Sequence, residues 1–170
     1  LLILLFLSIK MIASEPSVII GYGASQFKSP GQQQTTVASS YSLGLVQDFS
    51  SDDTEKVRLA GLFNTNRSDE SSSVLSEIEL QISLKKIFLP KQSVAVGFQV
   101  AYPLSNSFDD YEIKGTGFGV NISYAYQIFD SVTWNITGKS TSYTLGVNDS
   151  ESFDKLTNQS VSTYISIGVD

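Results

Sequence analysis

Apolar and polar residues alternate with a period of two along most of this chain. The clearest stretch is 74–88, in which Ile78, Leu80, Ile82 and Leu84 are separated by polar residues. Such alternation is typical of a β-strand with one apolar and one polar face. A shift of one residue would exchange the two faces, so the pattern also indicates which side chains share a face. The predicted strands are 17–27, 36–49, 55–64, 74–88, 93–102, 116–129, 131–147 and 160–169.

The polar face of these strands is rich in small side chains, most clearly in 93–102 and 116–129, where Gly, Ala, Ser and Asn recur. Small side chains suit the narrow interior of an eight-stranded barrel. Several of the stretches also reach the roughly 9 to 11 residues with which a tilted strand crosses a bilayer. The pattern therefore favours a membrane barrel with its apolar face outside and its polar face inside.

A soluble barrel is the alternative that alternation alone leaves open. A secreted or periplasmic lipocalin-like barrel would bind a small apolar ligand and hold its apolar residues inside. In that fold Val96, Phe98, Ile122 and Tyr124 would point inward. The direction of these four side chains therefore separates the two alternatives.

The predicted connections alternate in length along the chain. Short links lie at 50–54, at 89–92 and at Asp130, and long polar links lie at 28–35, 65–73, 103–115 and 148–159. Outer-membrane barrels have this alternation of short turns and long extracellular loops. We therefore predict an all-β fold, an eight-stranded antiparallel up-and-down transmembrane β-barrel, with the long loops outside.

Large aromatic residues stand near both ends of the predicted strands. Phe49, Phe88, Phe129 and Trp134 lie beside short links, and Phe63, Tyr102, Phe118 and Tyr143 lie beside long ones. Membrane barrels carry aromatic girdles at both interfaces, so these eight residues are candidates for two girdles. The general preference of aromatic residues for strands is the other explanation.

The stretch 131–147 changes phase along its length. Its apolar face begins with Val132, Trp134 and Ile136 and continues with Tyr143. One extra residue in the strand would restore a single apolar face, so we expect a β-bulge at 138–142.

Over residues 17–170 the pattern resembles the small eight-stranded outer-membrane barrels of the OmpA/OmpX type, and 161–170 resembles their last strand. The resemblance implies a bacterial outer-membrane location, with outer-membrane lipid and the outer-membrane assembly machinery as partners. Members of this type usually end in an aromatic residue that the insertion machinery reads. Asp170 departs from that pattern.

The start of the chain has a different character. Leu1 to Ile9 form an apolar run, and polar residues follow Ser14. This order is typical of the apolar region and cleavage zone of a secretory signal peptide. We therefore interpret 1–14 as the remnant of a signal peptide and 15–170 as the barrel domain.

Charged residues on the polar faces of the third and fourth predicted strands would project into the lumen. They are Arg58, Glu77, Glu79 and Lys85. A hairpin centred near Asp69 would place Arg58 opposite Leu80 and thus beside Glu79. Buried charges require partners, so we expect a lumen charge network, which Lys139 and Asp48 could join. It would either neutralise the interior or act as an ionic plug or gate.

Familiar catalytic and metal-binding patterns are absent from the sequence. The chain has no His and no Cys, so the usual general base and the usual transition-metal ligands are missing. The acidic residues around the first short link lack the spacing of an EF-hand, and Gly115 to Gly119 lack the Lys and Ser or Thr of a phosphate-binding loop. We predict no catalytic residue, no metal and no cofactor.

The charge of the chain and the long links bear on its partners. Eleven basic residues are scattered along a chain of net charge -6, which excludes a phosphate-binding patch and therefore nucleic acid. The long links 103–115 and 148–159 are acidic and contain aromatic residues. We expect a non-enzymatic protein with a structural or surface-interaction role, whose lumen is closed by polar and charged side chains and whose long loops make extracellular contacts.

Overall fold

The fold is built from strands. The computed structural model describes residues 12–14, 16–28, 35–50, 54–71, 73–105, 107–108, 111–145 and 155–169. None of these segments is a helix that could span a membrane. The long strands are β2 Ser17–Lys28, β3 Thr35–Ser50, β4 Glu55–Ser68, β5 Val74–Leu89, β6 Gln92–Pro103, β8 Tyr111–Phe129, β9 Val132–Leu145 and β10 Lys155–Gly168, and the short ones are β1 Ile12–Ala13 and β7 Ser107–Phe108.

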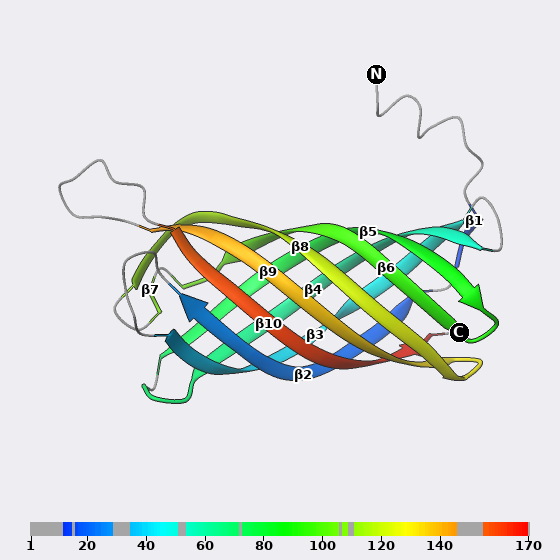
Figure 1. Cartoon of the computed structure of the whole chain (residues 1–170), viewed down its shortest axis with the longest axis horizontal. Coiled ribbons are helices and arrows are strands. Elements are labelled where there is room, and N and C mark those ends of the chain that lie inside the picture. Colours follow the sequence, from blue (N-terminus) through cyan, green and yellow to red (C-terminus); the bar gives the residue numbers. More distant parts are fainter. Residues whose placement is uncertain are drawn as a thin grey trace, which may run out of the picture.

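The eight long strands form a closed antiparallel barrel (Figure 1). Each long strand pairs with the next long strand along the chain, and β10 pairs with β2 from Thr157–Lys28 to Gly168–Ser17, which closes the sheet. The strands are strongly tilted, and the ends of β2 and β10 at Ser17 and Gly168 lie at the same end as the short turns. We call this the short-turn end and the opposite one the long-loop end. The predicted eight-stranded up-and-down architecture is confirmed.

The predicted strands match the observed ones closely at the short-turn end, where Pro90–Lys91 and Asp130–Ser131 form tight turns. At the long-loop end the strands run further than the apolar pattern indicates. β4 continues to Ser68, and β8 begins at Tyr111. Backbone ladder bonds need no apolar side chain, so the sheet continues past the apolar band.

The predicted bulge in β9 is wrong. β9 pairs with β10 without a shift from Thr144 to Val132, so the strand keeps one phase throughout. The irregularity lies on the neighbouring strand, where the β8–β9 register shifts between Lys114 and Phe118. Gly115 there has a φ of 79°, a conformation that glycine adopts readily and that suits a bulge. Because β9 keeps its phase, Tyr143 points into the barrel and is buried.

The two faces of the sheet have opposite chemistry. The outer wall carries the large apolar side chains, with Leu84 72% exposed and Ile82 49% exposed, and the interior carries mostly small polar ones. Val96, Phe98 and Ile122 are 56%, 70% and 57% exposed and lie on the outer wall. A soluble lipocalin-like barrel would need these side chains inside, so that alternative is wrong.

Glycines inside the barrel make room for two large rings. A Cβ at Gly21 would collide with the ring of Tyr164, and a Cβ at Gly117 would collide with the ring of Tyr143. Most interior positions of β6 are small as well, with Ser93, Ala95 and Ala101 buried, and Gln99 is the large exception. Small residues on the polar face therefore let the few large interior side chains fill the narrow lumen.

The described part of the N-terminal segment, which precedes Ser17 of β2, pairs with the last residues of β3. Ile12 pairs with Ser50 and Ala13 with Phe49, and the amide of Ser14 donates to the carbonyl of Asp48 over 2.8 Å. Most of the segment interpreted as a signal-peptide remnant, 1–11, lies outside the described residues, as do Asp52, Asp53 and Asp170.

Candidate functional site: the barrel lumen

The inward side chains of β5 give the order of layers along the lumen. From the long-loop end to the short-turn end they are Leu75, Glu77, Glu79, Gln81, Ser83 and Lys85. Leu75 lies in an apolar cluster, the two glutamates lie in a hydrogen-bonded network, and Lys85 lies in an ion-paired group near the short-turn end. The lumen is therefore filled by side chains of different chemistry at each level.

An ion-paired group, which we call the basic cluster, consists of Asp48, Arg58 and Lys85. Arg58 donates from Nε to Asp48 Oδ1 over 2.7 Å and from Nη2 to Oδ2 over 3.1 Å. Lys85 Nζ lies 2.7 Å from Asp48 Oδ2. One carboxylate thus neutralises one of two cations, and the three side chains are 12 to 15% exposed. A two-point arginine–carboxylate contact is among the stronger ion pairs in proteins.

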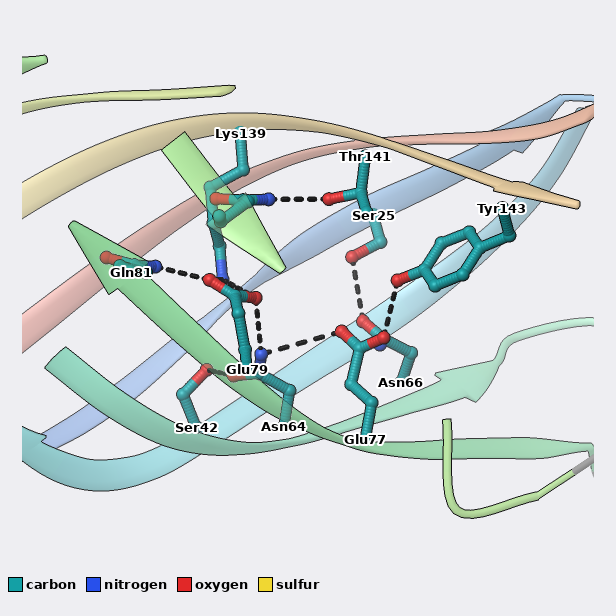
Figure 2. Close-up of polar contacts among 11 residues, drawn as sticks. Ser25, Ser42, Asn64, Asn66, Glu77, Glu79, Gln81, Lys139, Thr141 and Tyr143 are labelled. Carbon is teal, nitrogen blue, oxygen red and sulfur yellow. Dashed lines mark hydrogen bonds and ion pairs between the residues drawn. The ribbon is translucent and has the colours of Figure 1, made fainter. Parts of the chain in front are cut away.

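A second group, the acidic cluster, lies deeper and consists of Glu77, Glu79, Asn64, Lys139 and Tyr143 (Figure 2). Lys139 Nζ lies 3.0 Å from Glu79 Oε2. Asn64 Nδ2 donates to the same oxygen over 2.7 Å, and the hydroxyl of Tyr143 donates to Glu77. The ammonium group of Lys139 contacts only Glu79 of the two carboxylates, so the acceptor sites of Glu77 are filled by neutral donors, Tyr143 and Asn64.

Neighbouring polar side chains hold the acidic cluster in place. Gln81 donates to Glu79, and Ser42 donates to Asn64 Oδ1 over 2.7 Å, which orients the Asn64 amide toward the carboxylates. Lys139 also lies 6.0 Å from the centre of the Tyr164 ring, within the range of a cation–π contact. The donors come from β3, β4, β5 and β9, so the cluster links opposite walls of the barrel.

The four predicted lumen residues, Arg58, Glu77, Glu79 and Lys85, all point inward, but the structure divides them between the two clusters. The predicted pairing of Arg58 with Glu79 is wrong. Arg58 lies opposite Ser83, and Leu80 lies opposite Gly61, because the hairpin turn is centred further along the chain than Asp69. The partner of Arg58 is Asp48, which lies directly opposite it on β3.

The long-loop end of the lumen is filled by an apolar group that sequence reasoning missed. We call it the apolar stopper, and it consists of Phe27, Leu75, Phe108, Ile113 and Leu156. The rings of Phe27 and Phe108 have centroids 4.4 Å apart. A signal was present, because Phe27 and Leu75 stand on the polar face of their strands, in phase with Ser25 and Glu77. Phe108 had no such signal, since it belongs to a long link.

Phe108 reaches the stopper from the connection between β6 and β8. Its strand β7 pairs with the start of β8, with Phe108 opposite Tyr111. The side chain of Phe108 is fully buried. A short hairpin at the long-loop end therefore places an apolar ring inside the mouth of the barrel.

The predicted girdle residues lie on the outer surface with one exception. Phe63, Phe88, Tyr102, Phe118 and Phe129 are exposed. Phe49 and Trp134 are half-buried, and the indole of Trp134 donates to Thr163 Oγ1 over 2.7 Å. Tyr143 was placed in the girdle because of the supposed phase change, and its inward direction excludes it.

Sequence reasoning also left two aromatic residues of the outer wall without an assigned place. Tyr22 and Tyr41 lie directly opposite each other on β2 and β3, and their ring centroids are 5.3 Å apart.

Among the described residues, no group of three or more His, Cys, Asp or Glu could hold a metal ion. Asp48, the acidic residue of the first short link that lies inside the barrel, is occupied by its two cations.

Comparison with known proteins supports the fold and no narrower relationship. No family model matches the sequence, and no curated protein matches it. The crystal structure of Neisserial surface protein A (NspA) superposes with a TM-score of 0.64 at 14% identity, over 93% of this chain and 99% of that one. Ail, the attachment invasion locus protein of Yersinia pestis, superposes with a TM-score of 0.55 at 12% identity, over 92% of this chain and 100% of that one. The chain therefore has the fold of the small eight-stranded outer-membrane β-barrels.

Proposed function

We propose that this chain is an integral protein of a bacterial outer membrane, with a non-enzymatic structural or surface-interaction role and a lumen closed to solutes. The observation that carries the proposal is the reversal of the two faces. Large apolar side chains cover the outer wall, and charged and polar side chains fill the interior. In water such a wall would be a very large exposed apolar surface, whereas in a bilayer it contacts acyl chains.

The filling of the lumen supports closure to solutes. The basic cluster, the acidic cluster and the apolar stopper follow one another along the barrel. Between the two clusters lies a cavity of about 30 Å³, which has room for one or two water molecules. A general pore would need a continuous aqueous passage, as wider barrels have.

The composition of the lumen supports a non-enzymatic role. The chain contains no His and no Cys. The buried carboxylates of the acidic cluster are engaged by Lys139, Asn64 and Tyr143. We propose outer-membrane lipid as the partner of the outer wall and the outer-membrane assembly machinery as the partner during insertion. The long loops 103–115 and 148–159 are proposed as surfaces for extracellular contacts.

Heat modifiability of the expressed protein tests the proposal. A folded barrel resists unfolding by SDS until it is boiled, so the outer-membrane fraction should give two mobilities on a gel, one before and one after boiling. The proposal fails if the protein is recovered in the soluble fraction and its mobility does not change on boiling.

A substitution on the outer wall provides a second test. Ile122 lies on the outer face of β8, and Ile122→Lys would place a charge there. A lysine at the middle of the lipid face costs about 2 to 4 kcal/mol. We expect lower yield of the heat-modifiable form, with Ser71→Lys, an exposed position at the long-loop end, as the control. Equal yields of the two variants would contradict a lipid-facing wall.

A further inference from the structure

The side chains of the basic cluster are more exposed than those of the acidic cluster and of the stopper. At the short-turn end, the side chains of the basic cluster are 12 to 15% exposed. Further in, Lys139 is 6% and Glu79 is 2% exposed. At the long-loop end, Leu75 and Phe108 are fully buried. Solvent therefore reaches the lumen from the short-turn end, and the long-loop end is closed.

Three buried polar atoms without a hydrogen-bond partner line the small cavity between the two clusters, and four others, on Asn66, Gln99, Asn158 and Ser162, lie elsewhere in the described part of the barrel. Asn121 Nδ2, Asn135 Oδ1 and Tyr164 Oη have no hydrogen-bond partner among the described residues. All three residues line the 30 Å³ cavity, together with Arg58 of the basic cluster. A buried polar atom without a partner costs about 1 to 3 kcal/mol, and in folded proteins such atoms are usually satisfied by internal water.

The opposite mouth is closed in a different way. The stopper offers only apolar carbon, whereas the lumen below it combines hydrogen-bonding groups with a second apolar cluster around the cavity, formed by Ile19, Val46, Ala60 and Leu62. Directly beneath it, Ser25 donates to Asn66 over 2.9 Å, and both residues are buried. Four of the five stopper residues lie on the long strands of the barrel wall, whereas Phe108 comes from the short β7 hairpin. Phe108 is thus the one stopper residue that does not belong to a long strand of the wall.

We propose that the lumen is a blind shaft: water enters it from the short-turn end as far as the cavity at Asn121, Asn135 and Tyr164, and the apolar stopper, to which β7 contributes Phe108, closes it at the long-loop end. The proposal deepens the closed lumen of the proposed function and rests on it. It assigns a water site to the cavity and separates the two means of closure. Ion pairs narrow one mouth, and an apolar contact closes the other.

Thiol accessibility in vesicles tests the shaft, because the chain has no native Cys. Asn121→Cys places a thiol at the cavity, and Asn66→Cys places one beneath the stopper. Ag⁺, a thiol reagent close to water in size, is added to one side of vesicles whose barrel orientation is fixed by protease cleavage. Reaction is read from the thiol that remains after unfolding. Asp69→Cys, exposed at the long-loop end, is the reference.

We expect Asn121→Cys to react from the short-turn side and Asn66→Cys to be protected from the long-loop side. Adding Phe108→Ser should raise the rate at Asn66→Cys from the long-loop side by at least about tenfold, since it opens the mouth locally. Phe118→Ser, which removes a ring from the outer wall, should leave that rate unchanged. Phe108→Leu, which keeps an apolar side chain, should preserve the protection.

Three results would overturn the proposal in a barrel that has inserted and kept its heat-modifiable mobility. They are no reaction of Asn121→Cys from the short-turn side, a reaction of Asn66→Cys as fast as that of Asp69→Cys with Phe108 intact, and no effect of Phe108→Ser. If Phe108→Ser does not fold, the first two results still decide. Failure of every variant to insert would instead contradict the proposed membrane location.

Discussion

Asp48 is the residue on which the charge balance of the short-turn end depends. It is the acceptor for both Arg58 and Lys85, which approach it from β4 and β5. Without its carboxylate the two cations would face each other inside the barrel. Such unpaired charges are more costly than the net value of the pair itself.

Asp48→Asn should therefore lower the free energy of unfolding by about 1 to 3 kcal/mol, a value reduced from that of a fully buried pair because the three side chains keep some contact with solvent. This free energy is measured by urea titration of the protein in vesicles, with the heat-modifiable gel band as the measure of folded protein. Lys86→Gln, which breaks a surface ion pair with Glu55 at 3.2 Å, is the matched control and should change the value by less than about 1 kcal/mol. A similar decrease in the free energy of unfolding in both variants would show that the basic cluster stabilises the barrel no more than a surface ion pair does.

The glycines of the barrel include positions where an added Cβ would collide with a neighbour and positions where it would not. A second pair of substitutions compares the stability of one of each kind. A Cβ at Gly21 would collide with the Tyr164 ring, whereas at Gly61, on the outer wall, it would meet nothing closer than Leu80 at 3.8 Å. Gly21→Ala should destabilise the barrel by about 1 to 3 kcal/mol through overpacking. Gly61→Ala should be neutral or stabilising by up to about 1 kcal/mol. Unfolding midpoints in urea check both, and a larger loss for Gly61→Ala would contradict the assignment of faces.

The sequence predicts the direction of single side chains well where neighbouring residues repeat the pattern, and poorly where they do not. Ile78 to Leu84 alternate without interruption, and their outward direction is correct. The partner of Arg58 could not be derived in the same way, because it depends on the exact centres of the two turns on either side of β4. An error of one to two residues in the centre of the β4–β5 turn replaces Ser83 by Leu80 and gives the wrong ion pair.

At the scale of elements, β9 is a strand whose sequence does not reveal which of its side chains point outward. Its outward positions beyond Ile136 are Gly138, Ser140 and Ser142, which carry no apolar signal. The large residue that follows, Tyr143, then resembles a return of the outer face. Pairing with β10 decides otherwise, because a ladder without a shift fixes every side chain of both strands.

The phase of β9 leads to a prediction about Tyr143. Its hydroxyl donates to the buried Glu77, so Tyr143→Phe should lower the free energy of unfolding by about 1 to 3 kcal/mol by removing a donor from a buried carboxylate. Tyr126→Phe, on the outer wall of β8, is the control and should change it by less than about 0.5 kcal/mol. Were Tyr143 a girdle residue, the two substitutions would have the same small effect.

The exact strand ends and the residues of the stopper could not be predicted from the sequence. The alternation of short and long links follows from composition, and the eight strands follow with it. The position of Phe108 does not, because it is set by a short hairpin that folds back over the mouth of the barrel. A side chain in a long link carries no periodic signal that could assign it to the lumen.

At the scale of the whole molecule, the barrel combines an apolar wall with a mostly polar interior, which has one apolar cluster at the long-loop mouth and a second one beside the inner cavity. The net charges of the basic and acidic clusters are opposite, because the first has two cations and one carboxylate and the second has two carboxylates and one ammonium group. A barrel of this kind is specified by which face is apolar more than by any single contact. The central property that we propose for it is that the outer wall lies in lipid.

The single tryptophan of the chain, Trp134, provides the most direct measurement of that property. It lies on β9 among the residues of the outer wall, and its indole donates a hydrogen bond to Thr163 Oγ1 on β10. The protein is refolded into vesicles of lipids with brominated acyl chains and into matched vesicles without bromine. Because bromine quenches indole fluorescence only at close range, we predict strong quenching of Trp134 in the brominated vesicles, together with a heat-modifiable band. Equal fluorescence in the two kinds of vesicle, from protein that shows the heat-modifiable band, would contradict a wall that faces lipid.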